Sequence, residues 1–298
     1  MPGPAARRPR PNLRKLMFVL PNLFTVSSIF CGIYSITLCC GEAATGDQLY
    51  RAAISIFFGN FFDAFDGRVA RMTKTQSEFG VELDSLADVI TFGVAPAILV
   101  YKWALFSMGT LGMCVCAAYA ACGAIRLARF NVLAHNDTGV QRYFVGLPIP
   151  LAAGMVVSLV IALHQPGRPA SELVGLGPIV TMMLVLAFLM VSTIRYRTFK
   201  EAGLNPKTAL AFLLVIGVGV LIALRGRPQL VLLVYFSFYI LLGLAEEALF
   251  GRRRRAAAAA AAAAIPEPEE PLIPAEEDEE SPEGGEPEDE NPSPRTAR

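Results

Sequence analysis

Charged residues are scarce in this sequence of 298 residues. They make up 17% of the chain, against about 25% in an ordinary soluble domain. Hydrophobic residues make up 54% of it. This composition excludes a soluble globular enzyme and a mainly disordered chain. An excess of charge of one sign is also missing, because 26 basic residues balance 26 acidic ones. Nucleic acid is therefore not an expected partner.

Closely spaced cysteine pairs of the C-x-x-C kind are absent as well. The six cysteines lie in or beside apolar runs. Free cysteine in such surroundings behaves as a small hydrophobic residue. We therefore expect these side chains to pack rather than to hold a metal ion or form disulfides.

Long apolar runs are the main feature of the sequence. A membrane-spanning helix needs about 20 mostly apolar residues. The candidate runs are 16–40, 49–70, 85–106, 108–130, 144–164, 172–194, 207–224 and 228–250. The sequence thus predicts an all-α polytopic membrane protein with about eight transmembrane helices.

Basic residues between these runs predict the orientation of the chain. Nineteen of them fall on one side of the predicted membrane and five on the other. Loops rich in Lys and Arg stay in the cytoplasm. Both termini are therefore expected to be cytoplasmic, which agrees with an even number of spans. A bacterial-type cytoplasmic membrane fits best, since no organelle-targeting pattern is evident.

Half of the acidic residues lie in the last part of the chain, after Ile265. This part is rich in Pro and Glu and poor in bulky apolar residues, so it cannot bury a core. We expect a basic cytoplasmic segment over 1–15, a transmembrane catalytic domain over 16–250 and a disordered cytoplasmic tail over 251–298.

Four aspartates occur where two predicted spans approach the cytoplasm. Asp63 and Asp66 are three residues apart on one span, and Asp84 and Asp88 are four apart on the next. Each pair shares a helix face, and the short connector makes the two helices antiparallel neighbours. An ionisable residue in a membrane helix costs about 2.5–3.5 kcal/mol on insertion scales, and it usually marks a functional site.

Convergence of four carboxylates at one point requires compensating positive charge. Two divalent cations supply it, and hard oxygen ligands favour Mg²⁺ or Mn²⁺. Such a pair of ions typically assists phosphoryl transfer. A simpler alternative is that the aspartates pair with Arg68, Arg71 and Lys74 at the membrane surface.

The segment 63–88 reads D-x2-D-G-x2-A-R-x8-G-x3-D-x3-D. This pattern resembles the signature of the CDP-alcohol phosphatidyltransferase family, with every fixed position filled. The resemblance covers most of 12–250 and implies a helical membrane bundle of that family's type. It also implies transfer of a phosphatidyl group from a CDP-linked lipid to an alcohol with release of CMP, two divalent ions and a homodimer.

The resemblance also implies roles for individual residues. The implied metal ligands are Asp63, Asp66, Asp84 and Asp88, and Asp88 is also the implied catalytic base. The implied CDP-lipid contacts are Gly67, Arg71, Ser77, Asn22 and Thr25.

Two further segments, GAIRLARFN (123–131) and FVGLPIPLAAG (144–154), resemble the branch of the family that uses serine. The resemblance implies that CDP-diacylglycerol and L-serine are the substrates and that Arg126, Arg129 and Asn131 bind the acceptor. A serine carboxylate needs a cation, although the arginines also fit ordinary flanking charge.

Other functions stay open from the sequence. The acceptor alcohol could be glycerol 3-phosphate, inositol phosphate or choline. A more distant alternative is a divalent-cation transporter lined by the four aspartates, which Gly67 and Arg71 disfavour because an arginine beside a cation path is repulsive.

Overall fold

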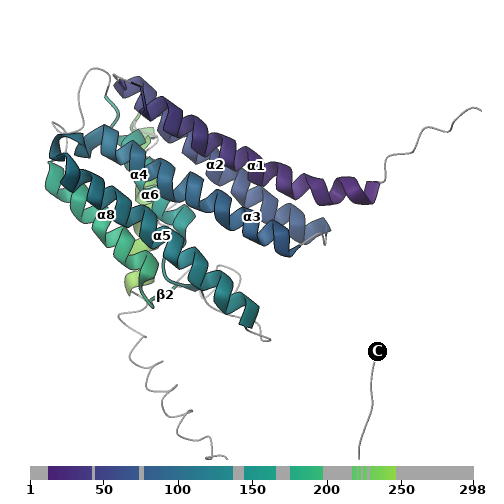
Figure 1. The fold of residues 1–298 in the computed structure, drawn as a ribbon. Coiled ribbons are helices and arrows are strands. Elements are labelled where there is room, and N and C mark those ends of the chain that lie inside the picture. The colour runs from purple at the N-terminus through teal and green to yellow at the C-terminus, as the bar shows by residue number, and fades with distance from the viewer. Residues whose placement is uncertain are drawn as a thin grey trace, which may run out of the picture. The chain divides into compact units, whose positions relative to one another are not determined.

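The computed structural model describes residues 13–41, 44–73, 77–136, 144–165 and 175–196, together with 217–245 except for 220, 223, 227 and 228. Helices make up nearly all of the regular structure in this part of the chain. Figure 1 shows them packed side by side as a bundle of long rods. The expectation of an all-α fold is confirmed here.

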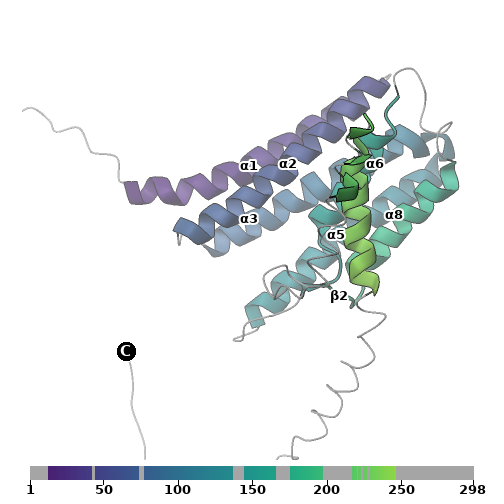
Figure 2. The ribbon, with the colours of Figure 1, turned by 180° about the vertical axis from the view of Figure 1, so that it is seen from behind.

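Two long helices form one side of the bundle. Helix α1 covers Leu13–Cys39 and α2 covers Gly46–Thr73. They lie against each other over most of their length, as Figures 1 and 2 show from opposite sides. Hydrogen bonds join Thr25 to Asp66 and Ser55 to Cys31, so the two helices run antiparallel. The N-terminal end of α1 therefore lies beside the C-terminal end of α2, which carries the aspartates.

A third long helical stretch runs continuously from Glu78 to Met108. It consists of α3 (Glu78–Asp88), the π-helical turn η1 (Val89–Val94), α4 (Ala95–Val100), a second π-helical turn η2 (Tyr101–Leu105) and the 3-10 turn η3 (Phe106–Met108). Ser77 begins it as the N-cap, because its Oγ accepts a hydrogen bond from the Gly80 N–H at 3.0 Å. Gly109 adopts a φ of 57° and starts the next helix.

The remaining helices complete the bundle. They are α5 (Thr110–Asn136), α6 (Ile149–Ala162), α8 (Leu176–Val191) and a helix over Gln229–Ala245. A short antiparallel ladder pairs β1 (Phe144–Val145) with β2 (Arg195–Tyr196). The buried core lies among these helices and includes Phe92, Tyr119 and Met183. Proline at the first turn of α6 sets its start.

Three of the described helical stretches are long and apolar enough to cross a membrane: Pro21–Cys39, Glu78–Met108 and Thr110–Leu133. Shorter apolar helices cover Ile149–Ala162, Leu176–Val191 and Gln229–Ala245. The number of eight spans stays a prediction, since most of the predicted span 207–224 lies outside the described residues.

Most predicted boundaries differ from the observed ones by a few residues, and two of the differences have a clear structural cause. The span expected at 85–106 begins at Glu78, because the polar turns that carry the aspartates are helical too. The span expected at 144–164 begins at Ile149, because Gly146 has a φ of 83° in a turn beside Met190 and the short ladder precedes the helix. The predicted tail, 251–298, and the N-terminal segment, 1–15, lie outside the described side chains.

Candidate functional site

Three aspartates from two helices meet at one end of the bundle. One carboxylate oxygen each from Asp63, Asp66 and Asp84 lie within 4.8 Å of one another. Asp88, one turn further along α3 from Asp84, is in hydrogen-bonding contact with Asp63. The predicted convergence of the two helix faces is therefore confirmed in its geometry.

Charge compensation for this cluster is incomplete within the described part of the chain, where Arg126 interacts electrostatically with Asp88 without forming an ion pair. None of the four carboxylates forms an ion pair with a described Lys or Arg, and the ion pair that is present joins His164 to Asp47 at the far end of α2. Among the described residues, surface pairing with Arg68 or Arg71 is thus absent, while Lys74 lies outside them.

Two carboxylate oxygens in the cluster have no hydrogen-bond partner although they are buried. They are Oδ1 of Asp84 and Oδ1 of Asp88. A buried acceptor without a partner costs about 1–3 kcal/mol, more when it is charged. Hard oxygen ligands with free lone pairs, clustered and not paired with a described Lys or Arg, fit a divalent cation. The donor set of the site is therefore suited to a Mg²⁺-type or Mn²⁺-type ion.

Helix α1 also contacts the carboxylate cluster, through a hydrogen bond from Thr25. Thr25 is buried, and its Oγ1 donates to Oδ2 of Asp66 at 2.8 Å. This bond spans 41 positions in the sequence and fixes one carboxylate relative to the first helix. Thr25 thus supports a predicted metal ligand, in addition to its expected place beside the nucleotide.

A cavity of about 370 Å³ opens beside the carboxylates. Its wall contains all five residues that were predicted to contact the CDP-lipid. They are Asn22, Thr25, Gly67, Arg71 and Ser77. Asp66 and Asp84 also line it, so the cavity and the acidic cluster form one site.

The first turn of α3 faces this cavity through Ser77, Gly80 and Val81. The N-terminus of a helix presents free N–H groups and a partial positive charge, which favour a bound phosphate. Arg71, which also lines the cavity, adds a full positive charge. An anionic group between these two elements would also lie next to the carboxylate cluster, which makes the cavity suitable for a phosphate ester that a metal ion assists.

Gly67 leaves room in the cavity rather than between helices. A Cβ atom at this position would meet no other atom within 4 Å. Among the described residues, no helix therefore comes close enough to require a glycine here. The space beside Gly67 belongs to the cavity, and a ligand phosphate can approach the backbone there.

The three predicted acceptor residues have different surroundings on α5. Arg126 is 8% exposed, interacts electrostatically with Asp88 and stacks on Phe130 at 5.9 Å. Arg129 donates from Nη1 to the Val191 carbonyl at 3.3 Å. Both arginines line one small cavity of about 20 Å³. Only Arg126 of the three lies at the carboxylate cluster in the described contacts.

Asn131 contacts α3 instead. Its Nδ2 donates to Ser85 Oγ at 3.0 Å and to Glu82 Oε2 at 3.3 Å. Glu82, Ser85 and Phe130 are site neighbours that the sequence reasoning missed. A signal for Phe130 was available, since it lies between two predicted acceptor residues. The contacts of Glu82 and Ser85 with α5 depend on packing between distant segments and have no local signal.

A helical bundle with apolar, membrane-length helices and an acidic cavity at one end defines the class of this protein: a membrane-type helical protein with a carboxylate cluster that could hold a metal ion beside an arginine-lined cavity. The family model that matches residues 18–194 is the one described as CDP-alcohol phosphatidyltransferase. The chain belongs to this family.

Several curated relatives carry one name. The chain is 39% identical over 230 residues to CDP-diacylglycerol–serine O-phosphatidyltransferase of Helicobacter pylori (strain J99), which covers 76% of this chain and 90% of that protein. It is 34% identical over 185 residues to the protein of the same name in Bacillus subtilis, covering 62% of this chain and 93% of that protein. A Saccharomyces cerevisiae protein of this name is 37% identical over 153 residues, covering 49% of this chain and 55% of its own length.

Proposed function

We propose that this chain transfers the phosphatidyl group of CDP-diacylglycerol to the hydroxyl group of L-serine and releases CMP. Relatives of that name across bacteria and yeast support the reaction. One structural observation supports it most strongly: the segment from Asp63 to Asp88 brings its aspartates together beside a single cavity, and no described Lys or Arg forms an ion pair with them. The same cavity gives no support to an ion pathway, because Arg71 lines it.

Different residues that line the cavity would bind different parts of the CDP-lipid. Arg71 and the first turn of α3 would hold the pyrophosphate through charge and N–H groups. Gly67 leaves the space that a phosphate needs next to the backbone. Asn22 and Thr25, at the α1 wall, would face the nucleotide. The acyl chains would stay among lipids beside the bundle.

The aspartates would hold two divalent cations, Mg²⁺ or Mn²⁺, through Asp63, Asp66, Asp84 and Asp88. Such ions, when bound, neutralise the charge of the pyrophosphate and stabilise the leaving group. The cluster fits them because two of its buried oxygens lack hydrogen-bond partners and no described Lys or Arg forms an ion pair with it.

Asp88 would act as the base for the serine hydroxyl. The hydroxyl proton passes to a carboxylate oxygen of Asp88, the serine oxygen forms a bond to the β-phosphorus, and the bond between that phosphorus and the bridging oxygen breaks. CMP leaves with that oxygen, so atoms and charge balance. Arg126 is buried and interacts electrostatically with Asp88, so it would orient the base and bind the serine carboxylate. Arg129 and Asn131 would complete the acceptor side.

The arrangement in the membrane is part of the same proposal. The chain would span a bacterial-type cytoplasmic membrane about eight times over 16–250, with both termini, the segment 1–15 and the tail 251–298 in the cytoplasm. The site would open to the cytoplasm, where CDP-lipid headgroups and serine are available. Two copies would form a homodimer, as the family resemblance implies.

The deciding experiment measures CMP release from CDP-diacylglycerol by the purified full-length chain with Mg²⁺ or Mn²⁺, with and without L-serine. Metal-dependent release that serine stimulates is the expected result. Stimulation by glycerol 3-phosphate, inositol phosphate or choline instead of serine would keep the chemistry and refute the acceptor. Folded protein that releases no CMP with any of these alcohols would refute the transfer reaction.

A further inference from the structure

The π-helical turn η1, Val89–Val94, joins the part of α3 that carries two aspartates to the buried helix α4. The N–H group of Ala95 donates to the carbonyl of Ile90, five positions earlier instead of the usual four. Such a wide turn offsets the residues before it by one helical position from those after it, which is about 100° of rotation. The direction in which Asp84 and Asp88 point therefore depends on whether η1 stays wide.

Pro96, just beyond this turn, deprives one carbonyl of its ordinary donor. A proline has no N–H group, so the carbonyl four positions earlier loses the donor that an α-helix would supply. That carbonyl belongs to Phe92, a residue of η1. Tyr119 on α5 replaces the missing donor, because its hydroxyl group donates to the Phe92 carbonyl at 3.1 Å and its side chain is fully buried. A buried acceptor without a donor is costly, so this bond stabilises the turn in its wide form.

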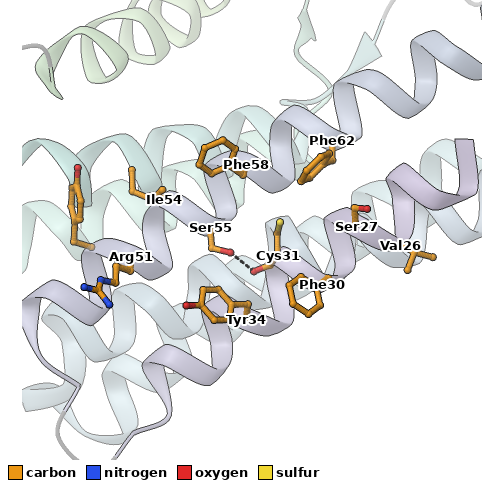
Figure 3. A pocket seen from close by; sticks show the side chains of 11 residues that line it. Val26, Ser27, Phe30, Cys31, Tyr34, Arg51, Ile54, Ser55, Phe58 and Phe62 are labelled. Atoms are coloured by element: carbon orange, nitrogen blue, oxygen red, sulfur yellow. Dashed lines mark hydrogen bonds between the residues drawn. The ribbon is translucent and has the colours of Figure 1, made fainter. Parts of the chain in front are cut away.

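The other side chain that anchors the turn is Thr91. Its Oγ1 donates to the Ser28 carbonyl on α1 at 3.0 Å. Helices α1 and α2 are joined to each other at the same level, since Ser55 Oγ donates to the Cys31 carbonyl at 2.8 Å, as Figure 3 shows. The α1–α2 pair is therefore a fixed reference for the rotation of α3, and α2 carries the other two aspartates of the cluster.

We propose that Tyr119 is a positioning residue for the carboxylate cluster: it keeps η1 wide and so keeps the aspartates of α3 turned toward those of α2. Tyr119 acts through the Phe92 carbonyl. Arg126, two turns further along α5, interacts electrostatically with Asp88, so one helix contacts both the turn and the aspartate that precedes it. This inference rests on the proposed function only for the ions that the cluster would hold, because the rotation of α3 can be measured without them.

The first test is Tyr119→Phe in the purified full-length chain, which keeps the ring and removes the donor. It should lower the melting temperature by about 2–4 °C, the shift that the loss of one ordinary hydrogen bond predicts. It should also lower the affinity for Mn²⁺ roughly tenfold, as measured by electron paramagnetic resonance. Tyr101→Phe is the matched control and should change neither value. Tyr101 lies on the same helical stretch as η1, and its hydroxyl group forms no hydrogen bond among the described residues.

The double variant of Tyr119→Phe with Pro96→Ala separates positioning from stability. The alanine N–H group can donate to the Phe92 carbonyl in an ordinary α-helical turn, so the melting temperature should recover. The same change narrows η1 and rotates α3, so the Mn²⁺ affinity should stay low. If Tyr119 served stability alone, both values would recover together.

Spin labels measure the rotation of α3 without any metal ion in the cluster. Arg68→Cys on α2 and Phe79→Cys on α3 place the labels at exposed positions. The background carries Cys40→Ser and Cys114→Ser, and the other cysteines are buried or half-buried. A helix with its side chains is about 10–12 Å wide, so rotation by one residue step moves a surface label by several ångström. We expect double electron–electron resonance to report a changed distance in the double variant and the native distance in Tyr101→Phe.

Two results would overturn the proposal. An unchanged label distance in the double variant would mean that the turn does not set the rotation of α3. Wild-type Mn²⁺ affinity in both Tyr119→Phe and the double variant would mean that the cluster does not depend on Tyr119. Wild-type protein that binds no Mn²⁺ would instead refute the metal site of the proposed function, and the label distance would then decide the role of Tyr119.

Discussion

Asp84 and Asp47 differ in what surrounds their carboxylates, and this difference predicts their response to substitution. Asp84 lies in the acidic cluster with a buried, unpartnered oxygen, whereas Asp47 is 73% exposed and pairs with His164. Asp84→Asn keeps the shape of the side chain but removes a ligand charge. We expect Mn²⁺ affinity to fall by more than roughly tenfold, the loss that even outer contacts of a metal site cause.

Electron paramagnetic resonance of Mn²⁺ added to the purified chain measures this affinity without any need for turnover. Asp47→Asn is the matched control and should bind Mn²⁺ like the wild type. In metal-free buffer Asp84→Asn should be slightly more stable to heat, because it relieves repulsion among carboxylates. Wild-type Mn²⁺ affinity in Asp84→Asn would remove this residue from the ligand set.

Substitution of Gly67 by alanine should stabilise the protein and weaken its binding of CDP-diacylglycerol. Nothing in the described structure lies within 4 Å of a Cβ atom at this position, so alanine fits. Alanine is more favourable than glycine inside a helix by about 1 kcal/mol. The added methyl group, however, occupies cavity space beside the proposed pyrophosphate. Gly67→Ala should therefore raise the melting temperature and raise the KM for CDP-diacylglycerol.

Gly177→Ala in α8 is the control, since it also has open space around it and lies away from the cavity. It should leave the KM unchanged, and no rise in melting temperature is expected because Pro178 follows this position and disfavours a helical residue with a Cβ before it. Thermal unfolding and initial rates on the same preparations check both variants. An unchanged KM in Gly67→Ala would mean that the phosphate does not approach this backbone.

Residues with a local pattern could be predicted, and residues fixed by distant contacts could not. The spacing from Asp63 to Asp88 is enough to predict that both carboxylate pairs lie on facing sides of antiparallel helices. The hydrogen bond from Thr25 to Asp66 joins different helices, and so does the packing of Phe130 against the cavity. Such contacts depend on how rods rotate about their axes, which the sequence pattern leaves free.

At the scale of the helix, the π-helical turn η1 follows Asp88 directly and is held between α1 and α2. Thr91 in this turn donates from Oγ1 to the Ser28 carbonyl at 3.0 Å. A Cβ atom at Gly59 would lie 2.7 Å from Thr91 Cγ2, and one at Gly32 would lie 2.9 Å from Thr91 Cα. Both glycines are thus required by close packing around one threonine, on the segment that continues from the proposed base.

A double substitution tests this packing. Gly59→Ala should destabilise the protein by about 1–3 kcal/mol through overpacking, partly offset by its better helix propensity. Thr91→Ser removes the methyl group that clashes and keeps the hydroxyl. The double variant should therefore recover much of the lost melting temperature.

Gly32→Ala provides the contrast, because its clash involves the Thr91 backbone, and Thr91→Ser should not rescue it. Thermal unfolding of the purified variants in one detergent measures all four. Failure of Thr91→Ser to improve Gly59→Ala would mean that the methyl contact does not set the helix spacing.

Helix existence was easier to predict than helix ends. The apolar runs indicated every long described helix, because the membrane requirement is a simple length of apolar chain. The ends depend on capping and turns. The N-cap at Ser77 and the turn at Gly146 set the starts of α3 and α6, and both starts differ by several residues from those predicted by the apolar runs. The π-helical turns have no periodic signal at all, since the same residues fit an α-helix equally well.

At the scale of the whole molecule, the acidic cavity lies at one end of the α1–α2 pair. In the proposed reaction this end takes up water-soluble serine and a lipid headgroup. The two ends of the bundle therefore differ in chemistry, in agreement with the distribution of basic residues in the sequence. Positive loops predict that the acidic end is cytoplasmic.

Cysteine labelling in intact bacterial cells that express the chain tests this orientation. Cys40 is exposed at the end of α1, and Glu78 is exposed at the other end of the bundle, beside the cavity. Cys114 is exposed as well, so all measurements use a Cys114→Ser background. In that background a membrane-impermeant maleimide should label Cys40 from outside, and the addition of Cys40→Ser should remove that signal. When Glu78→Cys is then added, new labelling should require permeabilised cells, because the acidic end faces the cytoplasm. Labelling of position 78 in intact cells would reverse the topology and would place the proposed serine site on the wrong side of the membrane for its substrate.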